Sequence, residues 1–168
     1  MKIKIREAKP REAKETILVR WKSWLFAYKN IFTKEEINKH FEAKINSQEY
    51  IDKIIESIIK KTRWFVAEVE NKIVAVMRIG LPTGSDEDAE IYCLYCLPEY
   101  LRMGIGSKLF FKAIQIFKKD KYNFFVVCAL KDNIIGNSFY IKNGGKKIQL
   151  FKKELCGRQV EEVSINLK

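Results

Sequence analysis

The stretch from Leu94 to Leu109 constrains the fold of this chain more than any other. Its sequence, LYCLPEYLRMGIGSKL, begins with an apolar run that predicts a buried strand. Pro98 ends that strand because proline has no N–H to donate to a neighbouring strand. Gly104 and Gly106 follow, and a glycine backbone adopts conformations closed to residues with a Cβ. A helix predicted from Ser107 would then direct unpaired N–H groups and the positive end of its dipole at this loop, which favours a phosphate ligand.

Hydrophobic periodicity predicts strands and helices on both sides of this stretch. Two strand runs surround Asn71 and Lys72 and predict a hairpin. The segment 123–130 is almost entirely apolar, as is typical of a central parallel strand. The predicted strands are residues 2–6, 64–70, 73–79, 89–97, 123–130, 146–151 and 160–166, and the predicted helices are residues 10–28, 33–41, 47–59, 107–119 and 133–142. This order predicts one α/β (α+β) domain over residues 1–168.

The net charge of +11 at pH 7 favours anionic partners, which include nucleic acid, an anionic membrane surface and a phosphorylated cofactor. The lysines are spread along the chain rather than clustered, which argues against a nucleic-acid-binding face. The longest apolar run, Phe124–Leu130, is too short to span a bilayer, and the first residues lack the apolar segment of a secretory signal. We therefore expect a cytoplasmic protein that does not span a membrane.

Cysteine and histidine usage predicts no metal site. Cys93 and Cys96 have C-x-x-C spacing, but residues three apart on a strand point to opposite faces, and no second pair has zinc-ligand spacing. His40 is the only histidine and has no partner at ligand spacing, so we expect a structural or surface role for it. The four cysteines are expected to be buried free thiols in a reducing compartment. Trp24 and Tyr28 either belong to the core or line a substrate pocket.

The glycine loop resembles the signature [RQ]-x-x-G-x-[GA] of the GNAT superfamily of acyl-CoA-dependent N-acetyltransferases. Gly104 and Gly106 match its two small positions. Leu101 occupies the position where Arg or Gln is usual, and Arg102 places a basic residue one step later. This departure affects one side-chain contact to the cofactor and leaves the backbone cradle intact.

A second GNAT motif, N-x-x-A-x-x-[FL]-Y-x-x-x-G-F, resembles residues 133–145. Gly136 replaces the usual alanine, which exchanges one small residue for another. Gly145 replaces the usual phenylalanine, and we expect the loss of this apolar anchor to loosen the following turn. The order of strands and helices also follows the family, so the resemblance spans nearly the whole chain. The matching residues are Asn133, Phe139, Tyr140 and Gly144.

The resemblance implies a GNAT-like fold, in which helices flank a mixed, mostly antiparallel sheet whose central parallel strands splay apart. It implies an N-acetyltransferase that uses acetyl-CoA as its co-substrate and needs no metal. Pantetheine would pair with the main chain of Cys96 and Leu97 and hydrogen-bond Asn133. The pyrophosphate would bind the amides of Arg102, Met103, Gly104, Ile105, Gly106 and Ser107.

Two residues are the catalytic candidates. By resemblance, Tyr140 would stand beside the CoA sulfur, where a phenol with an ordinary pKa of about 10 donates a proton to the leaving thiolate. Glu90 begins the strand that leads into the glycine loop, and we expect it to share a face with Tyr92, Leu94 and Cys96. The histone-acetyltransferase branch places its base glutamate at this separation from the loop, so either Glu90 or water accepts the proton of the amine.

The acceptor amine is open between a polyamine, another small amine and a protein amine. The segments AEIYCLYCLPEY and W-K-S-W resemble the spermidine/spermine acetyltransferase branch. Acidic residues near the predicted site would attract a polycation, whereas the net charge of +11 would repel it; these acids are Asp86, Glu87, Asp88 and Glu90. The rival interpretation is a non-catalytic CoA-binding or regulatory module, favoured by Leu101 and Gly145. Relatives are often dimers, so a homodimer is also expected by resemblance.

Overall fold

The strands of the computed structural model, which describes residues 2–81 and 88–167, form one sheet in the order β1-β2-β3-β4-β5-β7-β6. β4 and β5 are parallel, and every other neighbouring pair is antiparallel. The sequence therefore correctly predicted a mixed, mostly antiparallel sheet. The strands are β1 (Lys4–Glu7), β2 (Arg63–Val69), β3 (Lys72–Gly80), β4 (Ala89–Cys96), β5 (Phe125–Leu130), β6 (Lys146–Leu155) and β7 (Arg158–Asn166).

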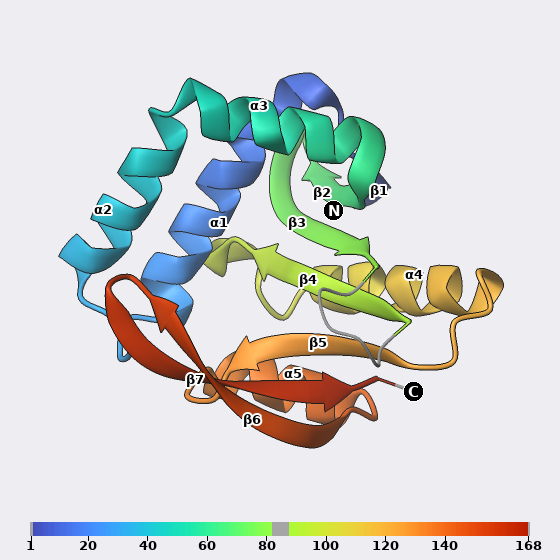
Figure 1. Ribbon diagram of the computed structural model, residues 1–168. Coiled ribbons are helices and arrows are strands. Elements are labelled where there is room, and N and C mark those ends of the chain that lie inside the picture. Colours follow the sequence, from blue (N-terminus) through green and yellow to red (C-terminus); the bar gives the residue numbers. More distant parts are fainter. Residues whose placement is uncertain (1, 82–87, 168) are drawn as a thin grey trace.

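Helices cover both faces of this sheet. On β2, the neighbouring residues Trp64 and Phe65 point to opposite faces: the Trp64 indole donates a hydrogen bond to Ser57 after α3, and the Phe65 ring lies below Lys112 of α4. α1 to α3 therefore lie on one face and α4 on the other, as Figure 1 shows. The helices are α1 (Ala13–Ala27), α2 (Lys34–Ile45), α3 (Gln48–Glu56), α4 (Ile105–Lys119) and α5 (Ile134–Lys142), with 3₁₀ turns at Pro10–Glu12 and Pro98–Tyr100 and a π-helical turn at Ser57–Lys61.

Local signals start several of these elements. Thr33 caps α2 in a capping box with Glu36, as the sequence predicts, and Ser47 accepts a hydrogen bond from the backbone of Tyr50 at the start of α3. Glu70 and Asn71 both have positive φ, so the β2–β3 turn lies one residue earlier than the predicted Asn71–Lys72. α4 begins at Ile105 rather than Ser107 because Gly104, in the left-handed conformation, already serves as its N-cap.

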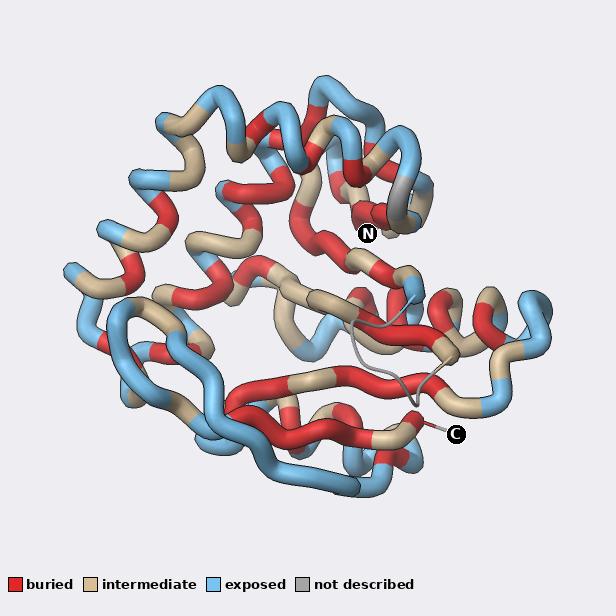
Figure 2. The backbone as a smooth tube through the Cα atoms, in the orientation of Figure 1, coloured by how far each residue is buried: buried red, intermediate tan, exposed pale blue. Residues whose placement is uncertain are grey.

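Buried side chains lie on both sides of the central strands, whereas β6 is exposed along nearly its whole length, as Figure 2 shows. Trp24 belongs to the core, where it contacts Tyr28 and Phe41 edge to face.

Arg6, on the edge strand β1, forms two ion pairs. Its guanidinium donates hydrogen bonds to both carboxylate oxygens of Glu12, at 2.9 and 2.8 Å, and to Glu68 at 2.7 Å. The Arg6 contacts therefore fix the start of the chain to β2 and to the first helical turn.

Candidate active site

The candidate site lies where β4 and β5 separate. The two strands pair through only three residue pairs, which run from Ala89–Phe125 to Ile91–Val127. Beyond these pairs the strands diverge toward their C-terminal ends (Figure 1). A cavity of about 110 Å³ occupies this region, and its lining comes from α1, β4, β5, the loop at Leu101 and α5. The predicted splay of the central strands is thus present, and the cavity follows from it.

The main-chain groups of Cys96 and Leu97 were both predicted to be free for pantetheine, but those of Leu97 are already hydrogen-bonded within the protein. The N–H of Leu97 donates to the Val74 carbonyl of β3 at 2.8 Å, and the Leu97 carbonyl accepts from Tyr100 N–H at 3.0 Å, so both groups are used within the protein. Successive residues of an antiparallel strand direct their main-chain groups to alternate sides. The main-chain groups of Leu94 and Cys96 therefore face β5 and the cavity. The expectation that the Leu97 main chain is free was wrong.

A β-bulge interrupts β4 at the edge of the cavity. Glu90 pairs with Gly80 and Cys93 pairs with Arg78, so three steps on β4 match two steps on β3, and Tyr92 is the additional residue. Since cross-strand partners share a face, Glu90 and Cys93 lie on the same face of the sheet. Without the bulge they would lie on opposite faces. The Arg78 guanidinium stacks over the Tyr92 ring at 4.4 Å, which keeps Tyr92 on this face as well.

The bulge corrects the predicted environment of Glu90. Cys93 and Tyr95 share its face, which is covered by α1, whereas Leu94 and Cys96 lie on the opposite face. Tyr92 was correctly expected beside Glu90. Period-two alternation is a reliable guide only on an uninterrupted strand, and a bulge shifts every later side chain to the other face.

The glycine loop opens α4 with unpaired amides. Gly104 has φ 78° and Arg102 has φ 63°, so the loop contains two left-handed residues. The first helical hydrogen bond joins Lys108 N–H to the Gly104 carbonyl at 3.0 Å. The amides of Ile105, Gly106 and Ser107 precede it and form the positive end of the helix. The side chains of Arg102 and Met103 are exposed beside these amides.

Tyr140 projects from α5 into the cavity wall. Its side chain is buried, with 6% relative exposure, and packs against the rings of Phe110 and Phe139. Burial, together with the nearby Tyr95 and Cys93, raises its pKa well above the ordinary value of 10.0. Tyr140 is therefore a neutral phenol throughout the physiological pH range, the state in which it can donate a proton.

A pair of tyrosines lies next to Tyr140. The hydroxyls of Tyr28, the C-cap of α1, and Tyr95 on β4 are 3.3 Å apart, and both residues line the cavity. Burial raises the pKa of each above 10.0, so both are neutral. Tyr28 thus belongs to the buried core and also lines the cavity, whereas Trp24 belongs to the core and does not line the cavity. Sequence reasoning missed Ser23, whose hydroxyl donates to the carbonyls of Val19 and Cys96.

Asn133 caps α5 and lines the cavity at the same time. Its Oδ1 accepts a hydrogen bond from Gly136 N–H at 3.0 Å, and its amide nitrogen lies on the other side of the carboxamide. A Cβ on Gly136 would lie 2.5 Å from that nitrogen, so glycine rather than alanine suits this orientation of Asn133. The departure from the family motif at Gly136 thus matches the local packing.

Gly145 is a close-packed position rather than a loose one. Its N–H donates to the Tyr140 carbonyl at 2.9 Å, and an added Cβ would lie 2.8 Å from that carbonyl oxygen and from Ile165. The expectation of a loosened turn was therefore wrong. The end of α5 instead packs directly on β7.

Glu90 lies in the short segment where β4 and β5 still pair, before the two strands separate. It is buried and pairs with Val126 of β5, and its charge acts on Tyr92, the first cavity-lining residue of β4. It does not itself line the cavity that Tyr140 lines. Asp88 accepts hydrogen bonds from the amides of Asn123 and Phe124, which ties the start of β4 to β5. The other two acids invoked for substrate attraction, Asp86 and Glu87, lie outside the described residues.

Within residues 2–81 and 88–167, no group of three or more His, Cys, Asp or Glu side chains is placed to hold a metal ion. The four cysteines are free and half-buried. His40 stacks on the Trp24 ring with centroids 5.2 Å apart, and burial and nearby cations lower its pKa to about 4.

Among the described residues, 2–81 and 88–167, no helix is both long and apolar enough to cross a membrane.

Comparison with known proteins shows which families and proteins this chain resembles. The profile of the acetyltransferase (GNAT) family matches residues 21–144. A spermidine N(1)-acetyltransferase of Thermoplasma acidophilum is 28% identical over 150 residues, which cover 87% of this chain and 89% of that protein. An uncharacterized N-acetyltransferase of Bacillus subtilis, YuaI, is 26% identical over 97% of this chain and 91% of its own length.

Solved structures share the fold. The crystal structure of a PaiA N-acetyltransferase from Thermoplasma acidophilum in complex with coenzyme A matches with a TM-score of 0.77 at 24% identity, over 97% of this chain and 98% of that chain. A GCN5-related N-acetyltransferase from Rhodopseudomonas palustris matches with a TM-score of 0.79 at 17% identity, over 99% and 95% of the two chains.

Proposed function

Because the chain belongs to the GNAT family of acetyltransferases, we propose that it transfers the acetyl group of acetyl-CoA to a primary amine by direct attack in a ternary complex. The observation that carries this proposal is the separation of β4 and β5 after three residue pairs, which opens a cavity with Tyr140 in its wall. Two curated relatives are named N-acetyltransferases, and one solved neighbour holds coenzyme A. A polyamine, another small amine and a protein amine are all acceptors that this chemistry allows.

The cofactor contacts follow from main-chain groups that face the gap between β4 and β5 and from the unpaired amides at the start of α4. Pantetheine pairs with the β5-facing main chain of Cys96, whose carbonyl also accepts a hydrogen bond from Ser23, and extends the sheet in the gap. The amide nitrogen of Asn133 donates to a carbonyl of the pantetheine arm. The pyrophosphate binds at the loop 102–107, where the amides before the first helical hydrogen bond and the helix dipole favour a negative charge. The exposed guanidinium of Arg102 adds a positive charge there.

The chemistry needs one proton to leave the amine and one to reach sulfur. The amine nitrogen attacks the carbonyl carbon of the thioester, a C–N bond forms, and a β4 main-chain N–H in the gap stabilises the oxyanion. The C–S bond then breaks, and the sulfur leaves as a thiolate. Tyr140 donates its proton to this sulfur because the buried phenol is neutral and close to the cavity.

Either Glu90 or water accepts the proton of the incoming amine. Glu90 lies on the α1 face of β4 together with Cys93 and Tyr95, which both line the cavity. It sits beyond the closed end of the cavity, so proton transfer from the amine to its carboxylate runs through water.

Acetyl-CoA binding by calorimetry, followed by thiol release with a panel of amines, tests the proposal. Binding followed by amine-dependent release of free thiol supports the enzyme. Binding without thiol release on any small or protein amine favours the rival, a CoA-binding module. A protein that does not bind acetyl-CoA would refute both.

A further inference from the structure

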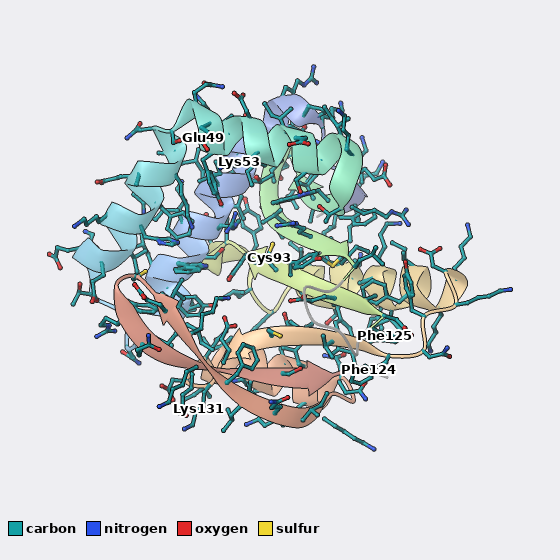
Figure 3. All side chains as sticks on the ribbon, in the orientation of Figure 1. Glu49, Lys53, Cys93, Phe124, Phe125 and Lys131 are labelled. Carbon is teal, nitrogen blue, oxygen red and sulfur yellow. The ribbon has the colours of Figure 1, made fainter. Side chains whose placement is uncertain are left out.

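A half-buried arginine of α1, Arg20, lies near the cavity without lining it. Cys93 and Tyr95 point from β4 toward α1, and both line the cavity that Tyr140 lines. Arg20 of α1 is close enough for its charge to act on both side chains. Figure 3 shows Cys93 near the middle of the molecule, on the part of β4 between α1 and β5. Arg20 thus lies near the part of β4 whose side chains share a cavity with Tyr140.

Arg20 donates a hydrogen bond from one side of its guanidinium, and within the described part of the chain the Nε on the other side has no acceptor. Its Nη1 donates to the hydroxyl of Tyr50 on α3 at 3.3 Å. Its Nε is fully buried and has no hydrogen-bond acceptor among the described residues. Nε and Nη2 form the side of a guanidinium that matches the two oxygens of a carboxylate. A buried, charged donor without an acceptor is costly, so this edge is the position where a carboxylate gains most.

A second cation reinforces this preference. Lys44 of α2 packs against the rings of Phe41 and Tyr50, at 5.5 and 5.4 Å from their centroids. Burial and the charge of Arg20 lower the pKa of Lys44 to about 8. Neither cation forms a salt bridge with a carboxylate in the described part of the chain. Two close cations without a countercharge attract an anion and repel a polycation.

We propose that the acceptor is a small amine that also carries a carboxylate, and that Arg20 binds this carboxylate through its Nε–Nη2 edge. The inference rests on the proposed acetyl transfer and narrows its substrate class. Arg20 acts as a specificity residue: it holds the anionic end of the acceptor near Cys93 and Tyr95 and leaves the amine directed at the cavity. Spermidine lacks the carboxylate, and the charges of Arg20 and Lys44 would repel it. The chain therefore differs in acceptor from its spermidine-named relative.

Matched acceptor pairs test the proposal. Thiol release is measured with glycine, β-alanine, γ-aminobutyrate and the standard α-amino acids, each beside the alkylamine of equal chain length, and with spermidine. At least one amino acid is expected to exceed its matched alkylamine by about tenfold or more in kcat/KM, as a charged bidentate contact allows. Alkylamines equal to their amino acids, or a preference for spermidine, would overturn the proposal.

Variants on α1 separate the contact from a general effect of charge. Arg20→Gln is expected to raise KM for the preferred amino acid by about tenfold or more, while KM for the matched alkylamine and the Kd of acetyl-CoA stay within about twofold. Lys22→Gln removes the same charge from the exposed side of the same helix and should leave both KM values unchanged. Arg20→Lys, which keeps the charge and loses the planar edge, covers the case in which Arg20→Gln does not fold. An unchanged KM in a folded Arg20 variant would refute the contact.

Calorimetry gives a readout that does not depend on turnover. The CoA-loaded protein is titrated with the same amino acids, and binding to the wild type that is lost in the Arg20 variants supports the inference. If acetyl-CoA does not bind, the proposed function fails, and the amino-acid titration of the free protein still tests Arg20. If no carboxylate-bearing amine binds in either titration, the inference is wrong whatever the outcome for acetyl-CoA.

Discussion

Replacement of Tyr140 by phenylalanine should remove catalysis without removing the fold or cofactor binding. The ring packs against Phe110 and Phe139, and phenylalanine keeps these contacts. No described side chain accepts or donates a hydrogen bond at the Tyr140 hydroxyl, so its loss should change the free energy of unfolding by less than about 1 kcal/mol. A positioned general acid contributes about 10²- to 10⁴-fold, which corresponds to about 2.7–5.4 kcal/mol in the activation barrier.

The assay is thiol release at saturating acetyl-CoA, with acetyl-CoA affinity from calorimetry and stability from urea unfolding. Tyr140→Phe should lower kcat by at least about 10²-fold and leave the Kd of acetyl-CoA within about twofold. Tyr122→Phe, which removes a hydroxyl from a ring packed on Phe117 outside the cavity, is the matched control and should have wild-type kcat. A Tyr140→Phe enzyme with wild-type kcat would refute the assignment of Tyr140 as the proton donor.

The pH profile gives an independent check on the same residue. A tyrosine acid is active while protonated, and burial raises the pKa of Tyr140 above 10.0. The wild-type kcat should therefore show no loss from Tyr140 ionisation up to pH 10.0, the ordinary pKa of a tyrosine. A fall in kcat near neutral pH that is absent from Tyr140→Phe would mean that the phenol ionises far too early to act as the acid.

Three further changes probe the base, the packing and the ion pairs. Glu90→Gln should lower kcat by about 10-fold or more and remove the acid limb of the kcat/KM profile if Glu90 is the base; an unchanged profile would assign the step to water alone. Gly145→Ala places a Cβ 2.8 Å from the Tyr140 carbonyl oxygen, and should lower the free energy of unfolding by about 1–3 kcal/mol in urea; wild-type stability would refute this packing. Glu12→Gln should cost about 2–3 kcal/mol at pH 7. Arg6 lowers the Glu12 pKa below 4.5, so the wild type keeps this contribution above pH 4.5 and loses it as pH falls further, and the two proteins should converge in stability under acid.

Most of the elements could be predicted because their signals are local. Thr33 with Glu36 marks the start of α2, and the two glycines after Pro98 mark the start of α4, although Gly104 caps the helix two residues earlier than expected. Alternation in β2 and β3 fixes a hairpin to within one residue. Helix caps and turns depend on a few neighbouring residues, so the sequence suffices to find them.

The orientation of the site residues could not be predicted, because it depends on how β4 pairs with two different neighbours. The bulge at Tyr92 appears only in the register with β3, and the sequence around it is a continuous apolar run with no signal of an extra residue. The Cys96 main chain faces β5, and the Leu97 N–H bonds to β3. Both orientations likewise follow from the ladder with β3 rather than from either residue type.

The bulge in β4 determines which side chains of the strand face α1, the side on which we propose that the amine binds. It directs Cys93 and Tyr95 toward α1, where Tyr28 and Arg20 lie, and leaves Leu94 and Cys96 on the face of α4. Without the bulge, Cys93 and Tyr95 would face α4, and Arg20 would lie over apolar side chains with no route to Tyr140. One additional residue in β4 therefore places Cys93 and Tyr95, which are near Arg20, in the wall of the cavity that Tyr140 also lines. Deletion of Tyr92 should uncouple them, with acetyl-CoA binding retained and acetyl transfer lost; retention of full activity would show that the register of β4 does not set the acceptor side.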